Sequence, residues 1–136
     1  MAKLQLNSLV KHANKLGKNP VRVTQEMAEE VYDAINRAVF RGTLPRPKIT
    51  VGDYSKKGFW GECEGYQRGS RWGEHYTKTI RIEKHMPLKT LVRVMAHEMV
   101  HQWEWENYGV MTHGEKTFFI WKEDLLAKGI RLSIVV

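Results

Sequence analysis

The spacing of apolar residues along this chain changes from helical periods to alternation and then back to helical periods. The first twenty residues are polar and basic with scattered leucines, and we expect a short helix there that packs on the body, with Pro20 ending the segment. Thr24 can cap a second helix, in which apolar residues recur at helical spacing to about Phe40. Gly42 and the prolines of LPRP at 44–47 then favour extended backbone.

The middle of the chain alternates between apolar and polar positions, which predicts a small sheet. Strands are expected at 48–54, 59–66 and 76–84, and the last of these alternates most regularly. Five glycines between positions 58 and 73 indicate a mobile hairpin or loop. The sequence IRLSIVV at 130–136 is compatible with a further strand. Expected helices come before and after a continuous run of strands along the chain, which predicts the α+β class.

The longest apolar stripe follows these strands. It begins after Pro87, a favoured residue at the start of a helix, and predicts a helix that ends near Tyr108 and Gly109. A last helix is expected over 115–128, with Gly129 as its cap. The stripe of the long helix comprises Leu88, Leu91, Val92, Met95, Ala96, Met99, Val100 and Trp103, and the inner side of the last helix Phe118, Trp121, Leu125 and Leu126.

Composition is typical of one globular domain. The chain has 136 residues, of which 42% are apolar and 27% are charged. With a single cysteine, Cys63, neither an internal disulfide nor a cysteine-based zinc module can form, which fits a reducing compartment. The first residues contain no unbroken apolar run and no small-residue cleavage site, so we expect no secretory signal, and no stretch approaches the roughly 18 apolar residues of a membrane span. We expect a soluble, cytoplasmic monomer with no membrane partner.

The net charge of +7 suits polyanionic partners, and the charge is unevenly placed. Five basic residues and no acid precede Glu26, so we separate a basic N-terminal arm (1–23) from the main domain (24–136). The arm is either simply solvated or docks on the phosphates of DNA. Docking would use Lys11, Lys15, Lys18 and Arg22, with help from Arg68 and Arg71 in the glycine-rich segment, where aromatic neighbours suit single-stranded DNA.

Residues 97–115, HEMVHQWEWENYGVMTHGE, gather three histidines and four glutamates in this basic chain. His97 and His101 are four residues apart on the expected helix, so both imidazoles can reach one metal ion. Glu98 lies about 100° around the helix from His97, where a general base can take a proton from a metal-activated water. This HExxH pattern predicts one Zn²⁺ per chain with Glu98 as the catalytic base; the alternative is two surface histidines on an amphipathic helix.

A catalytic zinc site needs a third protein ligand. The HExxHxxGxxH spacing is excluded, because Asn107 stands at the position of the last histidine and Glu104 at that of the glycine. His113 and Glu123 remain as candidates. We favour His113, because it follows the expected helix end and Gly114 gives the backbone freedom to turn the imidazole back toward the site.

Other polar residues lie near the motif in sequence. Glu104 and Glu106 either orient the ligands or are solvated helix surface, and we expect the second role for each. A peptidase also needs a group that stabilises the developing oxyanion. Tyr66, His75 and Tyr76 are candidates by their position beside the glycine-rich segment.

Three stretches together resemble the SprT-like zinc metalloproteases, the family that includes the eukaryotic protease Spartan. They are HEMVH at 97–101, the later His113-Gly114 followed by an aromatic residue, and the approach to the first strand. The last of these carries Tyr32, Asn36, Phe40, Leu44, Pro45, Pro47 and Ile49. The resemblance covers about residues 28–121. Unlike many relatives, this chain has no cysteine-rich zinc module, and its aromatic residue after His-Gly, Phe118, comes one position later than expected.

The resemblance implies a minimal zincin fold, in which a small sheet packs on the HExxH helix, and peptide-bond hydrolysis with Glu98 as base. It also implies protein substrates that are bound or crosslinked to DNA. In zincin-type sites the strand before the active-site helix, here 76–84, can pair with an extended substrate. We therefore expect a zinc endopeptidase acting on DNA-associated proteins. The alternatives are a DNA-binding accessory protein with a structural or vestigial zinc, and a general peptidase with no DNA role.

Overall fold

The structure is a computed structural model, and it describes residues 3–69 and 73–134. Its class is α+β, as expected. In chain order the elements are α1 (Leu6–Leu16), β1 (Pro20–Arg22), α2 (Gln25–Ala38), β2 (Lys48–Gly52), the 3-10 turn η1 (Ser55–Lys57), β3 (Gly61–Arg68), β4 (Glu74–Glu83), β5 (His85–Pro87), α3 (Leu88–Tyr108), α4 (Lys116–Phe119) and α5 (Lys122–Ala127).

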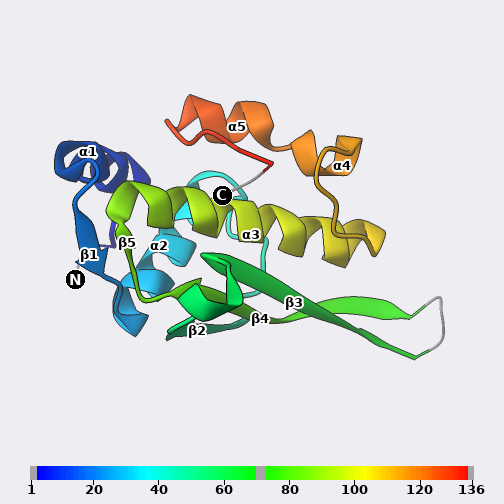
Figure 1. The fold of residues 1–136 in the computed structure, drawn as a ribbon. Coiled ribbons are helices and arrows are strands. Elements are labelled where there is room, and N and C mark those ends of the chain that lie inside the picture. The colour runs from blue at the N-terminus through cyan, green and yellow to red at the C-terminus, as the bar shows by residue number, and fades with distance from the viewer. Residues whose placement is uncertain (1–2, 70–72, 135–136) are drawn as a thin grey trace.

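The long helix α3 runs through the middle of the molecule and separates two layers (Figure 1). On one side lies a three-stranded sheet with the order β2-β4-β3, in which β2 is parallel and β3 antiparallel to β4. On the other side lie α4, α5 and the segment that follows them, while α1 packs beside the beginning of α3 (Figure 1). The β3–β4 hairpin extends past the C-terminal end of α3 (Figure 1).

The first helix belongs to the folded body, which confirms the prediction of a short packed helix there. Leu6, Leu9 and Ala13 are buried in the same core as α2 and α3. The next segment is tied down as well, because β1 pairs with β5 in an antiparallel ladder. Of the basic residues before Glu26, Lys11, Lys15 and Arg22 therefore lie on helices or strands that pack on or pair with the rest of the chain.

Buried polar side chains fix α3 to α2 and to the turn between α2 and β2. The hydroxyl of Tyr32 donates to Oε1 of Gln102 at 2.8 Å, and Nε2 of Gln102 donates to the carbonyl of Pro45 at 2.8 Å. Asn36 bonds both backbone groups of Leu44, at 2.9 and 3.2 Å. Gln102 directly follows His101, so this network fixes the part of α3 that carries the histidines.

The sheet approaches α3 so closely that two glycines are required where they meet. A Cβ at Gly61 would lie 2.5 Å from Cγ1 of Val94, and a Cβ at Gly65 would lie 2.3 Å from Nε1 of Trp105. The Trp105 indole donates to the carbonyl of Tyr76 at 2.9 Å, which anchors the hairpin to the helix. These contacts bring β3 over the HExxH residues.

Several boundaries differ from the sequence expectation. The helix expected at 115–128 is divided into two short helices, α4 and α5. Phe118 packs among the histidine rings, whereas Trp121 packs on Phe40 with 4.6 Å between the ring centroids, and one continuous helix does not serve both contacts. Leu126 is 54% exposed and not on the inner side. The glycine-rich segment contains strand β3, which reaches Arg68, and β4 begins directly after the segment at Glu74, while residues 70–72 lie outside the described residues.

The two short strands β1 and β5 were not expected, because three residues are too few to show alternation. At the other end of the chain, residues 130–133 are not a strand but an irregular segment that packs along α3. Within the described residues, no helix is long and apolar enough to cross a membrane.

Candidate metal centre

The side chains of His97, His101 and His113 converge on one point. Nε2 of His101 lies 3.0 Å from Nε2 of His97 and 3.1 Å from Nε2 of His113. The ligand atoms of all three lie within 4.8 Å of one another, so the three residues could hold a metal ion. His97 and His101 come from successive turns of α3, and His113 from the loop after Gly109 ends the helix with a φ of 67°. The preference for His113 as the third ligand agrees with this cluster.

Glu123, the alternative third ligand, does not join the cluster. It is exposed in the first turn of α5. Phe118 from α4 lies there instead, fully buried, with its ring centroid 5.2 to 5.9 Å from those of the three imidazoles. An apolar ring behind the ligands keeps water from that side. The sequence showed Phe118 as a core residue and gave no sign of this contact.

Both helical histidines are held through their second ring nitrogen. Nδ1 of His97 lies 2.8 Å from the carbonyl oxygen of Ser133, and Nδ1 of His101 lies 3.0 Å from Oε1 of Glu104. A carbonyl and a carboxylate can only accept, so each Nδ1 carries the proton and each Nε2 presents a lone pair. Orientation of this kind is typical of metal-binding histidines.

The expectation that Glu104 is solvated surface is wrong. Its side chain is fully buried and accepts hydrogen bonds from the Thr112 backbone at 3.1 Å and from the hydroxyls of Thr112 and Thr117 at 2.6 and 2.7 Å. Burial opposes its ionisation, but these donors outweigh burial and lower the pKa of Glu104. It is therefore an anion that orients His101. The signal was available, because residues three apart share a helix face.

Glu106 is not solvated surface either. Its carboxylate accepts from the Thr77 hydroxyl at 2.7 Å and from Nε2 of Gln102 at 2.9 Å, which links α3 to β4. It touches none of the three histidines in the described contacts. Its role is to fix the helix against the sheet.

The donor set fits a cation. Burial and then the neighbouring His101 lower the pKa of His97 to about 4, and burial also lowers the pKa of His101, so both rings are neutral at neutral pH. Neutral rings whose Nδ1 is protonated place their Nε2 lone pairs against each other at 3.0 Å, an arrangement that a shared cation stabilises. The spacing is close to the ~3.3 Å between two nitrogens on a tetrahedral ion with bonds of about 2.05 Å.

Glu98 lies at the wall of a cleft that also contains the histidines. The cleft has a volume of about 500 Å³, and its lining includes Gly61, Glu62, Cys63, Met111 and Ile134. Burial, followed by the charge of Glu62, raises the pKa of Glu98 to about 8. A cation on the adjacent histidines would favour the ionised form, which is the form that a base needs.

Cys63 lines the same cleft but does not belong to the ligand group. Burial, and then the charge of Glu98, raises the pKa of its thiol. A protonated thiol is a poor ligand. Among the described residues, the cluster therefore offers three protein ligands and no fourth.

The strand expected to pair with substrate is not the one at the cleft. Strand β4, which contains 76–84 almost completely, lies in the centre of the sheet and pairs on both sides. Its backbone groups are therefore engaged. Strand β3 is an edge strand, and its residues 61–63 line the cleft.

None of the three oxyanion candidates lines the cleft. His75 packs edge-on against Trp105, with 4.6 Å between the ring centroids. The rings of Tyr66 and Tyr76 stack on each other, with 5.4 Å between their centroids. Their positions near the glycine-rich segment in sequence place them along the hairpin, away from the histidines.

The basic residues proposed to contact nucleic acid fall into two groups. Lys11 and Lys15 are exposed on α1, with Lys18 and Arg22 exposed just after it. Arg68 is exposed at the far end of β3, with its guanidinium 6.0 and 5.6 Å from the rings of Tyr66 and Tyr76. The groups lie near opposite ends of α3, a helix of 21 residues and about 30 Å (Figure 1). Arg71 lies outside the described residues.

The candidate metal centre is thus built from three segments of the chain. Helix α3 supplies two imidazoles and Glu98, the loop after it supplies the third imidazole, and the C-terminal segment supplies the carbonyl of Ser133. Compared with known proteins, the chain matches no family model, and no curated protein or solved structure matches it significantly.

Proposed function

We propose that this protein is a zinc-dependent endopeptidase of the SprT-like kind, with a minimal zincin fold. The observation that carries the proposal is the convergence of three imidazole nitrogens beside Glu98 in an open cleft. Three neutral imidazoles are a ligand set that suits Zn²⁺ well. When bound, zinc would polarise the scissile carbonyl and make the attacking water more acidic.

Glu98 acts as the general base. Its carboxyl group lines the cleft beside the histidines, and none of its described contacts is a hydrogen bond, so it is free to accept a proton from water. The same group then passes the proton to the leaving amine. Burial raises the pKa of Glu98, while a cation on the histidines would favour its ionised form, so the carboxylate is present and able to accept a proton.

The substrate is a segment of extended polypeptide. The edge strand β3 borders the cleft, and an exposed edge can pair with an extended chain through backbone hydrogen bonds. Gly61 lets this edge approach to the level of Glu98, since a Cβ there would come 3.1 Å from Oε2 of Glu98. The scissile bond would thereby lie between the edge and the histidines.

The number of ligands argues against a purely structural zinc. Structural sites are closed by four protein ligands, whereas catalytic sites keep one position for water or substrate. The cluster has three in the described part of the chain, and the thiol of Cys63 stays protonated. This favours the enzyme over an accessory protein with a structural metal.

Glu98→Gln tests the mechanism. The substitution removes the base and keeps all three ligands, so we expect normal metal content with peptidase activity lower by about 10²–10⁴-fold. Glu115→Gln, an exposed acid close to the ligand His113, is the matched control and should leave activity unchanged. Near-normal cleavage by folded, zinc-loaded Glu98→Gln would refute the mechanism.

We further propose that the substrates are proteins associated with DNA, with the exposed cations of α1 and of the segment just after it as the DNA contact. Each phosphate contact on single-stranded DNA contributes about −0.7 to the slope of log affinity against log salt. Changing Lys11, Lys15, Lys18 and Arg22 to alanine should flatten this slope and leave cleavage of a small peptide intact. The control changes Lys56 and Lys57, which are exposed in η1. Absence of salt-dependent DNA binding by the wild-type protein would favour a general peptidase.

A further inference from the structure

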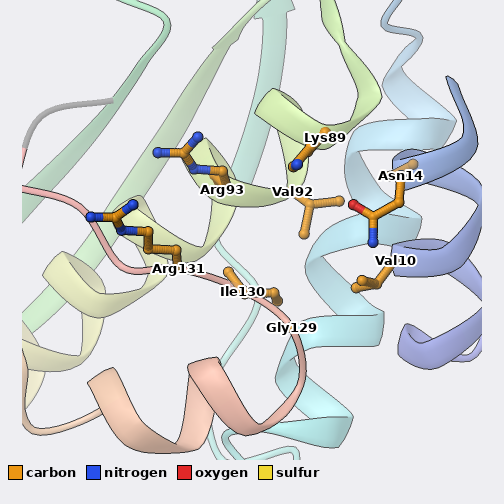
Figure 2. Close-up of a pocket in the computed structure, with 9 residues that line it drawn as sticks. Val10, Asn14, Lys89, Val92, Arg93, Gly129, Ile130 and Arg131 are labelled. Carbon is orange, nitrogen blue, oxygen red and sulfur yellow. The ribbon is translucent and has the colours of Figure 1, made fainter. Parts of the chain in front are cut away.

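A second cavity lies outside the peptidase cleft, between α1, the beginning of α3 and the segment after α5. Its volume is about 360 Å³, which is within the range of small-molecule sites. Its lining shares no residue with that of the metal cleft. The lining residues are Val10, Ala13, Asn14, Lys89, Val92, Arg93, Gly129, Ile130 and Arg131 (Figure 2).

Three of these residues are cations from two different segments. Lys89 and Arg93 are one turn apart on α3, and Arg131 comes from the C-terminal segment; in Figure 2 both guanidinium groups extend in the same direction, away from α1. None of the three has a carboxylate within ion-pair distance among the described residues. Like charges gathered around a cavity without a counter-charge repel each other, and an anion would relieve that repulsion.

The donors of Arg93 are largely unused. Nη2 donates to the hydroxyl of Ser133 at 3.0 Å, while Nε is buried and has no hydrogen-bond partner in the described structure. A guanidinium has five N–H donors in a planar fork that matches the oxygens of phosphate. Arg131 is exposed and has none of its donors engaged in the described contacts. The cavity lining therefore includes two guanidinium groups and an ammonium group whose donors are available to an oxyanion.

The remaining walls are mostly apolar. Ala13, Val92 and Ile130 are buried, and Val10 is half-buried. Gly129 keeps this space open, because a Cβ there would lie 3.2 Å from Cγ1 of Val10. A ligand that fills the cavity therefore needs an apolar body as well as a charged group, and each buried CH₂ or aromatic carbon adds to its affinity.

We propose that this cavity binds a small organic phosphate monoester, with its phosphate on Lys89, Arg93 and Arg131 and its apolar body against Val10, Val92 and Ile130. A phosphate monoester carries close to two negative charges at neutral pH, which suits three cations better than a carboxylate does. The inference does not depend on the peptidase proposal, because it uses none of the residues of the metal cleft. The site nevertheless adjoins the metal centre, since Ser133 bonds Arg93 through its side chain and faces His97 through its carbonyl.

The test uses phenyl phosphate as the probe, with the zinc-loaded protein, titration calorimetry and backbone amide NMR. Phenyl phosphate should shift the amide signals of Val10, Asn14 and Ile130. Inorganic phosphate, benzoate and phenol each lack one part of the probe and should bind at least about tenfold more weakly. Equal affinity for inorganic phosphate would overturn the apolar contact, and equal affinity for benzoate would overturn the choice of phosphate.

Variants locate the site. Arg131→Gln should weaken phenyl phosphate about tenfold, and the matched control Arg41→Gln, an exposed arginine that does not line the cavity, should not. Lys89→Gln provides the same test at a second exposed position, should Arg131→Gln fail to fold. Unchanged affinity in the folded variant would refute the proposal, as would shifts confined to the metal cleft around His101 and Met111.

Discussion

The two histidines of the HExxH motif are oriented by partners of different origin. His101 faces the carboxylate of Glu104, three residues further along the same helix, at 3.0 Å. His97 faces the backbone carbonyl of Ser133, 36 residues away in sequence, at 2.8 Å. One partner is an anion, and its position is set by the helix. The other is a neutral dipole, and it is in place only when the C-terminal segment packs along α3.

The difference concerns charge as well as origin. The pKa of Glu104 is lowered because hydroxyl and backbone donors from Thr112 and Thr117 outweigh the effect of burial, so an anion stands behind His101 at neutral pH. An anionic partner raises the basicity of the ligand and strengthens its bond to a metal. Behind His97 there is no charge of this kind among its described contacts. We therefore expect the metal to depend more on Glu104 than on Ser133.

Removing Glu104 should have the largest effect. Glu104→Ala leaves Nδ1 of His101 and three donors of Thr112 and Thr117 without their acceptor. Zinc affinity should fall about 100-fold, and the metal-free protein should lose about 2 kcal/mol or more of its free energy of unfolding, because buried donors become unpaired. Competition with a zinc chelator and denaturant unfolding measure the two quantities.

The isosteric variant Glu104→Gln separates charge from shape. Its amide oxygen can still accept from His101, and the threonine hydroxyls can rotate to accept from the amide nitrogen. We expect zinc affinity about tenfold below that of the wild type and little loss of stability. If Glu104→Gln binds zinc as weakly as Glu104→Ala, the negative charge alone accounts for the loss of affinity. If it binds zinc as tightly as the wild type, the charge of this partner does not contribute to zinc affinity.

The sequence was sufficient for the parts of the site that depend on one helix. The spacing of His97, Glu98 and His101 predicted their common face, and the stripe after Pro87 predicted α3 within one residue of its observed ends. The third member of the histidine cluster, His113, was predicted from its position after the helix. All of these depend on helical geometry and on a short loop.

What could not be predicted depends on contacts between distant segments. The partner of His97 comes from residues with a strand-like pattern, and in the structure these residues pack along α3 and join no strand ladder among the described residues. The edge position of β3 follows from the strand order, which the alternation of a single strand does not specify. The same holds for the break between α4 and α5, which is set by two separate packing sites for Phe118 and Trp121.

Loss of the carbonyl behind His97 should have an intermediate effect. A chain that ends at Leu132 lacks Ser133, so the imidazole of His97 loses its acceptor and can rotate or change tautomer. We expect zinc affinity to fall about tenfold, at the lower end of the range for such outer partners. A chain that ends at Ile134 keeps the Ser133 peptide carbonyl and serves as the control. An effect as large as that of Glu104→Ala would show that the two partners are equivalent.

The smallest effect is expected from Ser133→Ala, which separates the side chain of this residue from its carbonyl. The variant keeps the acceptor of His97 and removes the hydroxyl that accepts from Nη2 of Arg93 at 3.0 Å. The free energy of unfolding should fall by about 1 kcal/mol, because this is the typical net value of a hydrogen bond whose charged donor remains partly hydrated. Zinc affinity should stay within about threefold of that of the wild type. A larger loss of zinc would mean that Arg93 positions the carbonyl through the hydroxyl. The orientation of His97 would then depend on Arg93, which lines the second cavity. A ligand bound to Arg93 would in that case change the affinity for zinc.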